Sequence, residues 1–202
     1  IYASPEFQGT SERGLYGDVV QEIDWSVGEV LAAVEANGVR DETLIVFSSD
    51  NGPWLVMRDH GGSSGPLCEG KMYAFEGGVR VPTVAYWPGK IPAGSVYDDL
   101  ATMMDWFPTF AAAAGVALPD GVAYDGEDLL PVLQGLRHRQ GNEHLYFEGH
   151  QRHECYRKGD WKIKLEYDGF EGVVWKNAVP PHPLLLINLK DDPNELNNLA
   201  DE

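Results

Sequence analysis

The first quarter of the chain predicts one long amphipathic helix followed by a short buried strand. Across residues 16–34 apolar side chains recur every three or four positions, and most acidic side chains fall on other faces. That period is typical of a helix with one buried face. Asn37 and Gly38 form a suitable helix end, because both tolerate positive φ. Residues 43–49 are almost continuously apolar and β-prone, which predicts a strand buried on both faces and favours a parallel α/β sheet.

The middle of the chain is loop-rich. Residues 50–70 contain many Gly and Pro and predict a long loop, and long loops in compact domains are usually functional. Trp106, Phe107 and Phe110 can share one helix face, which we expect to lie in the core. Elements are predicted at residues 82–86 (strand), 105–114 (helix) and 129–133 (short helix).

A change in amino-acid composition near residue 136 predicts two structural units, a domain of residues 1–135 and a subdomain of residues 136–202. Residues 136–141 are polar and rich in Arg and His, as in a linker. The second unit predicts a small antiparallel sheet. Residues 161–165 alternate between apolar and lysine side chains, which is typical of a half-exposed strand, and Gly159-Asp160 suits a hairpin turn. Further strands are predicted at residues 145–147, 155–157 and 184–189.

The amino-acid composition limits the classes of molecule that this protein can bind. The 202 residues include 32 acidic and 15 basic side chains, a formal net charge of −17, so we expect no nucleic acid and no membrane partner. The longest apolar run is too short to span a bilayer. Cys68 and Cys155 allow at most one disulfide. The chain begins at Ile1 rather than Met, so we expect a processed product or a piece of a longer protein.

Two short motifs carry candidate chemistry. Asp50 and Asn51 follow the predicted strand, where α/β folds place ligand sites, and their oxygens suit a hard cation such as Ca²⁺ or Mg²⁺. An Asx turn that ends the strand is the alternative. Lys71 follows Gly70 in a long loop and can donate to an anionic oxygen. A solvated surface lysine is its alternative.

Other polar residues have less specific interpretations. Glu76 and Arg80 lie four positions apart, and we expect a structural ion pair between them. His60 lies on the long loop and can donate a proton or contact a substrate; an exposed loop histidine is the alternative. His150 and His153 are interpreted as rim or surface residues that can face a substrate.

An ordered set of short motifs resembles the C-terminal part of the type I sulfatases, the arylsulfatase family. Each motif is weak by itself, but together they cover essentially the whole chain in the family's order. The motifs are Asp50-Asn51-Gly52-Pro53, Gly70-Lys71, Phe75-Glu76-Gly77-Gly78-Val79-Arg80, Trp87-Pro88-Gly89, Asp105-Trp106-Phe107-Pro108, Lys158-Gly159-Asp160-Trp161-Lys162 and Asp191-Asp192-Pro193-Asn194-Glu195.

The resemblance implies an alkaline-phosphatase-like α/β fold. Residues 1–135 would form part of a mixed sheet sandwiched by helices, and residues 136–202 a small antiparallel-sheet subdomain. It implies that Asp50 and Asn51 are two of four metal-ligating side chains, usually for Ca²⁺ and also for Mg²⁺, and that Lys71 binds the sulfate group. The implied reaction is sulfuric-ester hydrolysis by a formylglycine nucleophile, on a sulfated small molecule or glycan.

The nucleophile itself is expected upstream. Neither Cys68 nor Cys155 lies in the family's C-x-P-S-R motif, so this chain holds no nucleophile and resembles a fragment whose partner is the N-terminal half of the same protein. We expect the isolated chain to be inactive and to bind Ca²⁺ weakly. Met72-Tyr73-Ala74 stands where the family often has Gly-Thr-Thr. Some relatives link a Cys before the Lys to the C-terminal subdomain, so the resemblance implies that Cys68 and Cys155 can pair; two free thiols are the alternative.

Three functions stay open at this point. They are a sulfatase fragment, a phosphate or phosphonate monoester hydrolase of the same superfamily, and a non-catalytic relative that binds sulfated glycans. Family habit implies a periplasmic, secreted or lysosomal location.

Overall fold

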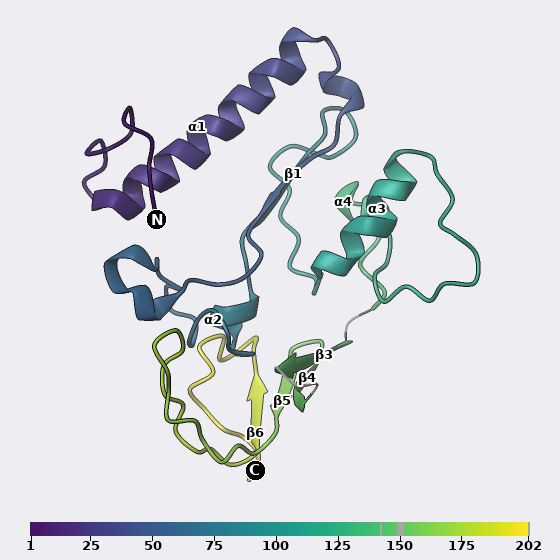
Figure 1. Ribbon diagram of the computed structural model, residues 1–202. Coiled ribbons are helices and arrows are strands. Elements are labelled where there is room, and N and C mark those ends of the chain that lie inside the picture. Colours follow the sequence, from purple (N-terminus) through teal and green to yellow (C-terminus); the bar gives the residue numbers. More distant parts are fainter. Residues whose placement is uncertain (142, 149–151, 202) are drawn as a thin grey trace.

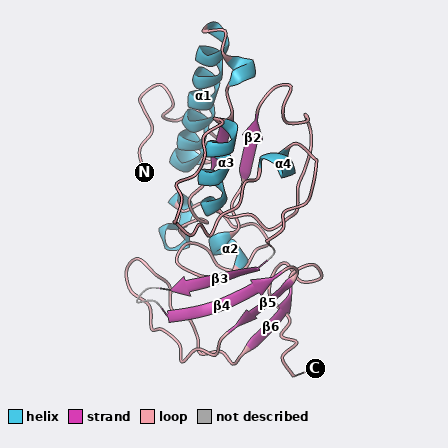
Figure 2. Ribbon diagram, turned by 90° about the vertical axis from the view of Figure 1, so that its right-hand side faces the viewer, coloured by secondary structure: helices cyan, strands magenta, loops and turns pink. Residues whose placement is uncertain are grey.

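The computed structural model describes residues 1–141, 143–148 and 152–201. Helices and a two-stranded ribbon lie above a four-stranded sheet that forms the other end of the molecule (Figure 2). The α/β fold class with a small antiparallel C-terminal sheet is confirmed. None of the helices in the described part combines the length and apolarity needed to cross a membrane.

The predicted long helix is present as α1 (Gly14–Ala36). Asp18 fastens the preceding segment to it, since its carboxylate accepts hydrogen bonds from the backbone N–H groups of Gly9 (2.9 Å) and Ser11 (2.8 Å). These bonds stabilise the charged form and lower the pKa of Asp18. The helix ends at Asn37, and Gly38 takes φ +67° as expected.

The apolar face of α1 is not buried within the described chain, contrary to expectation. Val20, Ile23 and Leu31 expose 46%, 44% and 37% of their surface. Part of this face borders an open apolar groove that α1 shares with the two-stranded ribbon; it is lined by Val27, Leu31, Val34, Ile45, Phe47, Val84 and Tyr86. The period therefore identified the apolar face correctly, but no described segment covers it.

The ribbon consists of β1 (Ile45–Ser48) and β2 (Thr83–Tyr86), which pair antiparallel. The expected parallel arrangement is wrong for these strands. A parallel partner requires a crossover connection, usually a helix, whereas residues 49–82 fold as loops and short turns beyond the end of β1 and lead back alongside it (Figure 1). Two-sided burial is also wrong, since Phe47 is 42% and Val84 61% exposed.

The second helical segment contains η3 (Met103–Asp105), α3 (Trp106–Ala113) and α4 (Leu130–Leu133). Trp106 and Phe110 stack with ring centroids 5.6 Å apart. The expectation that all three aromatics are core is wrong, because Phe107 and Phe110 remain 57% and 46% exposed. The buried side of this segment combines apolar Leu129 and Val132 with two polar residues, Thr109 and Asp105, which are fully buried.

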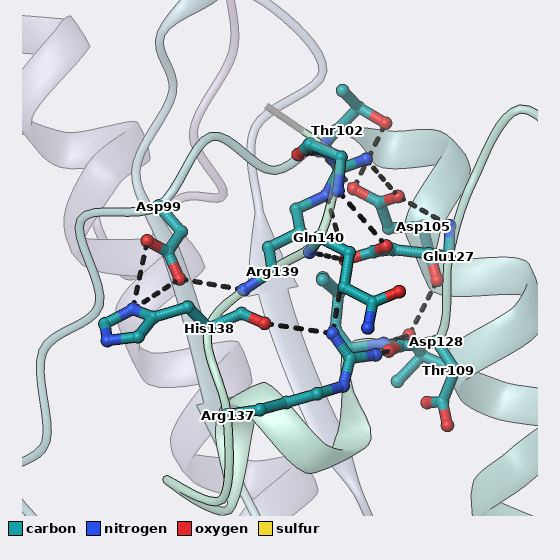
Figure 3. A network of polar contacts seen from close by, with 12 residues as sticks. Asp99, Thr102, Asp105, Thr109, Glu127, Asp128, Arg137, His138, Arg139 and Gln140 are labelled. Atoms are coloured by element: carbon teal, nitrogen blue, oxygen red, sulfur yellow. Dashed lines mark hydrogen bonds and ion pairs between the residues drawn. The ribbon is translucent and has the colours of Figure 1, made fainter. Parts of the chain in front are cut away.

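Asp105 ties this helical segment to the chain that enters the four-stranded sheet (Figure 3). Its carboxylate accepts hydrogen bonds from the backbone N–H groups of Thr102 (2.6 Å) and Glu127 (2.8 Å), and it pairs with Arg139 at 2.9 Å. The side chain of Arg139 is 6% exposed. The polar stretch expected to be a linker is therefore anchored by a buried ion pair.

The C-terminal sheet has the order β3-β4-β5-β6, with every neighbouring pair antiparallel, as predicted. Its strands are β3 (Glu143–Glu148), β4 (Arg152–Lys158), β5 (Trp161–Lys164) and β6 (Leu185–Asn188). Gly159 takes φ +57° in the β4–β5 hairpin. In β5 the lysines face inward: Lys162 and Lys164 are 0% and 4% exposed, whereas Trp161 is 47% exposed.

Cys68 and Cys155 are free thiols. Burial raises the pKa of Cys68 to about 11 and that of Cys155 to about 12. His150, and the side chain of His153, lie outside the described residues, so their expected position at a rim stays a prediction.

Candidate functional site

A pocket of about 610 Å³ opens at the C-terminal end of β1. It brings together Asp50, Asn51 and Lys71, three of the four residues singled out from the sequence. The pocket is lined by α1, the loop after β1 and the turn before β2; its polar side chains are Tyr16, Ser49, Asp50, Asn51, Ser63, Ser64, Lys71 and Arg80.

Asp50 and Asn51 begin the loop that leaves β1. Asp50 is exposed and Asn51 is half-buried. The hydroxyl of Ser49 donates to the backbone carbonyl of Asn51 (2.8 Å), which holds the turn. Gly52 then donates its backbone N–H to the carbonyl of Gly78 (2.9 Å). A Cβ on Gly52 would lie 1.8 Å from the carbonyl oxygen of Gly77, so only glycine permits this approach.

Lys71 is held against the same loop. Its backbone N–H donates to the carbonyl of Pro53 (2.8 Å), and its Nζ lies 5.2 Å from the centroid of the Trp54 ring. Glu69 and Met72 adopt φ +56° and +78°, a left-handed conformation that non-glycine residues rarely adopt. Such backbone strain clusters at functional sites, and here it surrounds the Lys71 turn.

Arg80 was not predicted as a pocket residue. The helix α2 (Glu76–Val79) is a single turn, and Arg80 follows it in an extended conformation. The expected Glu76–Arg80 ion pair is wrong, because Glu76 turns the other way and pairs with Lys162 (3.1 Å) and Arg157 (3.3 Å). The i, i+4 spacing would have brought the two side chains together only if the helix had continued through Arg80.

His60 ends the 3₁₀ helix η2 (Leu55–His60) and is exposed. It does not line the pocket, although its neighbour Gly61 does. Its proposed contact with a substrate stays a prediction.

A buried charge cluster adjoins the pocket at Glu76, the residue before Gly77 of the pocket lining. Lys162 Nζ contacts Glu76 Oε1 at 3.1 Å and Glu195 Oε1 at 2.9 Å, and these side chains are at most 1% exposed. Burial opposes the charge on Lys162, but Glu195 and Glu76 outweigh it and raise the pKa of Lys162. Burial raises the pKa of Glu195, which Lys162 counteracts. The cluster joins α2 to β5 and the C-terminal segment.

The oxygen donors fit part of a metal site. Asp50 and Asn51 supply two hard donors at the pocket, whereas Ca²⁺ takes six to eight oxygen ligands. Among the described residues, no three His, Cys, Asp or Glu side chains are grouped closely enough to hold a metal ion. These two residues can therefore form one side of a cation site and need ligands from elsewhere.

The pocket thus combines two cationic side chains with two oxygen donors at the end of a strand, a set of groups that can bind an oxyanion on an α/β scaffold. Comparison with known proteins identifies the family. The family model for sulfatases matches residues 2–116, and that for the C-terminal region of N-sulphoglucosamine sulphohydrolase matches residues 69–202. The chain belongs to the sulfatase family.

Individual sulfatases share this similarity. N-acetylgalactosamine-6-sulfatase of Canis lupus familiaris is 48% identical over 136 residues, which cover 67% of this chain and 26% of the relative. Human steryl-sulfatase is 34% identical, covering 99% of this chain and 38% of the relative. The crystal structure of PsFucS1 sulfatase from Pseudoalteromonas sp. matches with a TM-score of 0.84 and 31% identity, covering 98% of this chain and 41% of that one. The chain thus spans well under half the length of these relatives.

Proposed function

We propose that this chain supplies one wall of the active site of a sulfuric-ester hydrolase. The observation that carries the proposal is the convergence of Asp50, Asn51, Lys71 and Arg80 on one pocket in a member of the sulfatase family. The rest of the site, including a formylglycine nucleophile, would come from an N-terminal half of the same polypeptide. Residues 1–135 would belong to the catalytic domain and residues 136–202 to its C-terminal subdomain.

The unburied apolar surface supports a partner of this kind. Val20, Ile23 and Val84 are 44–61% exposed, and the groove between α1 and the β1–β2 ribbon is lined mostly by apolar side chains. Contiguous apolar surface of this kind marks an interface. In the proposed whole protein, the N-terminal half would complete the sheet and cover this groove.

The side chains of this chain would bind and polarise the sulfate group. Lys71 and Arg80 can donate charge-assisted hydrogen bonds to sulfate oxygens, which strengthen as negative charge develops in the transition state. Asp50 and Asn51 would hold a Ca²⁺ ion, which would supply further positive charge to the sulfate oxygens. The net reaction cleaves the ester with one water molecule and releases an alcohol, a sulfate ion and a proton. His60 would contact the leaving group from outside the pocket lining.

The substrate would be a sulfated small molecule or glycan, handled in the periplasm, outside the cell or in a lysosome. The test is to obtain the coding sequence upstream of Ile1 and express the complete protein with a formylglycine-generating enzyme. We expect hydrolysis of 4-methylumbelliferyl sulfate in preference to the matching phosphate.

Two variants make the test specific. Lys71→Ala should lower kcat/KM by about 10²–10³-fold, the usual cost of losing one donor to a developing anion. Lys90→Ala, at an exposed lysine remote from the pocket lining, should leave it unchanged. An upstream sequence without a nucleophile motif, or a complete protein inactive on sulfate esters, would contradict the proposal and favour a glycan-binding relative.

A further inference from the structure

Residues 167–182 form a narrow two-stranded ribbon that leaves the C-terminal sheet after β5. Three antiparallel bridges close it: Tyr167 with His182, Phe170 with Val179, and Val173 with Lys176. Val179 is buried in a cluster with Tyr73 and Phe75. In Figure 1 this yellow-green segment lies beside the blue segment that follows β1. We call it the 167–182 ribbon; its turn lies at Val174 and Trp175.

The turn of the ribbon is fastened to the pocket wall. The indole N–H of Trp54 donates to the backbone carbonyl of Trp175 (2.8 Å), and the hydroxyl of Tyr73 donates to the carbonyl of Asn177 (2.8 Å). Trp54 itself lines the pocket and lies under Lys71. One indole ring thus connects the oxyanion site to the ribbon turn.

What the turn presents outward is apolar. Val174 is 91% exposed and Trp175 is 56% exposed. An exposed indole whose backbone is bonded to a residue of a polar pocket suits a ligand contact, because binding pockets combine aromatic walls with a few directed polar groups. The backbone carbonyl of Trp175 is used structurally, whereas its side chain remains available.

We propose that Trp175 is the platform for the sugar ring whose sulfate occupies the Lys71 pocket. This deepens the proposed function and rests on it. One face of a pyranose ring carries C–H groups that pack on an indole, and its hydroxyl groups need hydrogen-bond partners. The pocket offers those partners in Ser63 and Ser64. A fused apolar ring system would bury these polar groups without partners, which costs free energy.

The experiment follows the indole N–H signals of the ¹⁵N-labelled complete protein by NMR, with 10 mM Ca²⁺ present and the nucleophile left unconverted so that the ligands are not hydrolysed. Ethyl sulfate has a sulfate ester but no sugar ring, whereas galactose 6-sulfate has a sulfate ester and a sugar ring. Ethyl sulfate should shift the Trp54 signal, and its binding should depend on Lys71. Galactose 6-sulfate should shift the Trp175 signal as well. Trp175→Ala should weaken the affinity for galactose 6-sulfate about 3- to 10-fold and leave the affinity for ethyl sulfate unchanged.

Matched variants separate stacking from folding. Trp175→Ala preserves the carbonyl that Trp54 binds, and Trp175→Phe should restore part of the affinity. Trp161→Ala, at a tryptophan on β5 that is 47% exposed against 56% for Trp175, should have no effect. If Trp175→Ala leaves galactose 6-sulfate binding intact, or if estrone sulfate depends more strongly on Trp175, the sugar platform is refuted. If ethyl sulfate does not bind at Lys71, the proposed function itself fails.

Discussion

The buried Lys162 allows a quantitative test of what joins the two ends of the molecule. Its ammonium group is fully buried and lies 3.1 Å from Glu76 and 2.9 Å from Glu195. Arg157 contacts Glu76 at 3.3 Å and is 16% exposed. Glu76 belongs to the pocket segment, whereas the other three belong to the C-terminal sheet and the segment after it.

Lys162→Met removes the central charge and keeps most of the side-chain volume. Two buried carboxylates then remain, and among the described residues Arg157 is the one cation left in an ion pair with either of them, at Glu76. Breaking a buried ion pair in this way costs about 3–5 kcal/mol of the free energy of unfolding. For a protein of this size, 1 kcal/mol shifts the melting temperature by about 2–4 °C, so we expect a fall of about 6–20 °C.

Thermal and urea unfolding monitored by circular dichroism would measure the effect. Lys158→Met is the control, because Lys158 also lies in the sheet and pairs with Glu143 at 3.2 Å, but both side chains are more than half exposed. An exposed ion pair contributes little to stability, because solvent screens it. A Lys162→Met variant within 1 kcal/mol of the parent would refute the argument that this cluster holds the molecule together.

The same variant predicts a pH dependence. The pKa of Lys162 is raised in the folded state, so its stabilisation is complete below the pKa of an unfolded lysine. It is lost as the pH rises through the higher folded value. The parent chain should therefore lose stability at alkaline pH by a step that Lys162→Met lacks.

Three further outcomes are expected. Gly52→Ala should destabilise the chain and weaken sulfate binding, because its Cβ would lie 1.8 Å from the Gly77 carbonyl oxygen. The control Gly28→Ala has open space around it in α1 and should raise the free energy of unfolding in urea by about 0.5–1 kcal/mol. At pH 9, alkylation by iodoacetamide should be about 50-fold slower at Cys68 and on the order of 500-fold slower at Cys155 than in urea, because their pKa values are raised to about 11 and about 12; equal native and denatured rates would contradict the burial. Calorimetry of the isolated chain should show Ca²⁺ binding no tighter than millimolar, since Asp50 is the one carboxylate and Asn51 the one carboxamide among the described residues that line the pocket; tight stoichiometric binding would refute the shared-site proposal.

The local pattern of apolar and polar residues predicted the helices and strands well, but not which of their faces are buried. The period of α1 and the hairpin at Gly159 were predicted because they depend on neighbouring residues. The inward lysines of β5 were not, because alternation defines two faces without saying which is buried. Lys162 is buried by a carboxylate 86 positions away in Glu76, and no local window contains that pairing.

The residues of the candidate site likewise divide into those that local sequence predicts and those that depend on distant contacts. Asp50, Asn51 and Lys71 were found through motif and spacing, and the structure gathers them at one pocket. Arg80 was missed because its spacing from Glu76 suggested an ion pair, and the end of α2 redirected it. Trp175 was missed because its position depends on a ribbon anchored at Trp54, 121 residues away.

The turn at Glu76–Val79 gives the C-terminal sheet influence over the pocket. Glu76 points into the charge cluster, while Gly78 accepts the hydrogen bond from Gly52 and Gly77 donates to the carbonyl of Cys68, three residues before Lys71. Loosening the cluster should therefore disturb both halves of the pocket without touching sulfate. At a temperature where Lys162→Met is still folded, its affinity for inorganic sulfate should fall, while that of Lys158→Met should not. Equal affinities would mean that the sheet stabilises the chain but does not position the site.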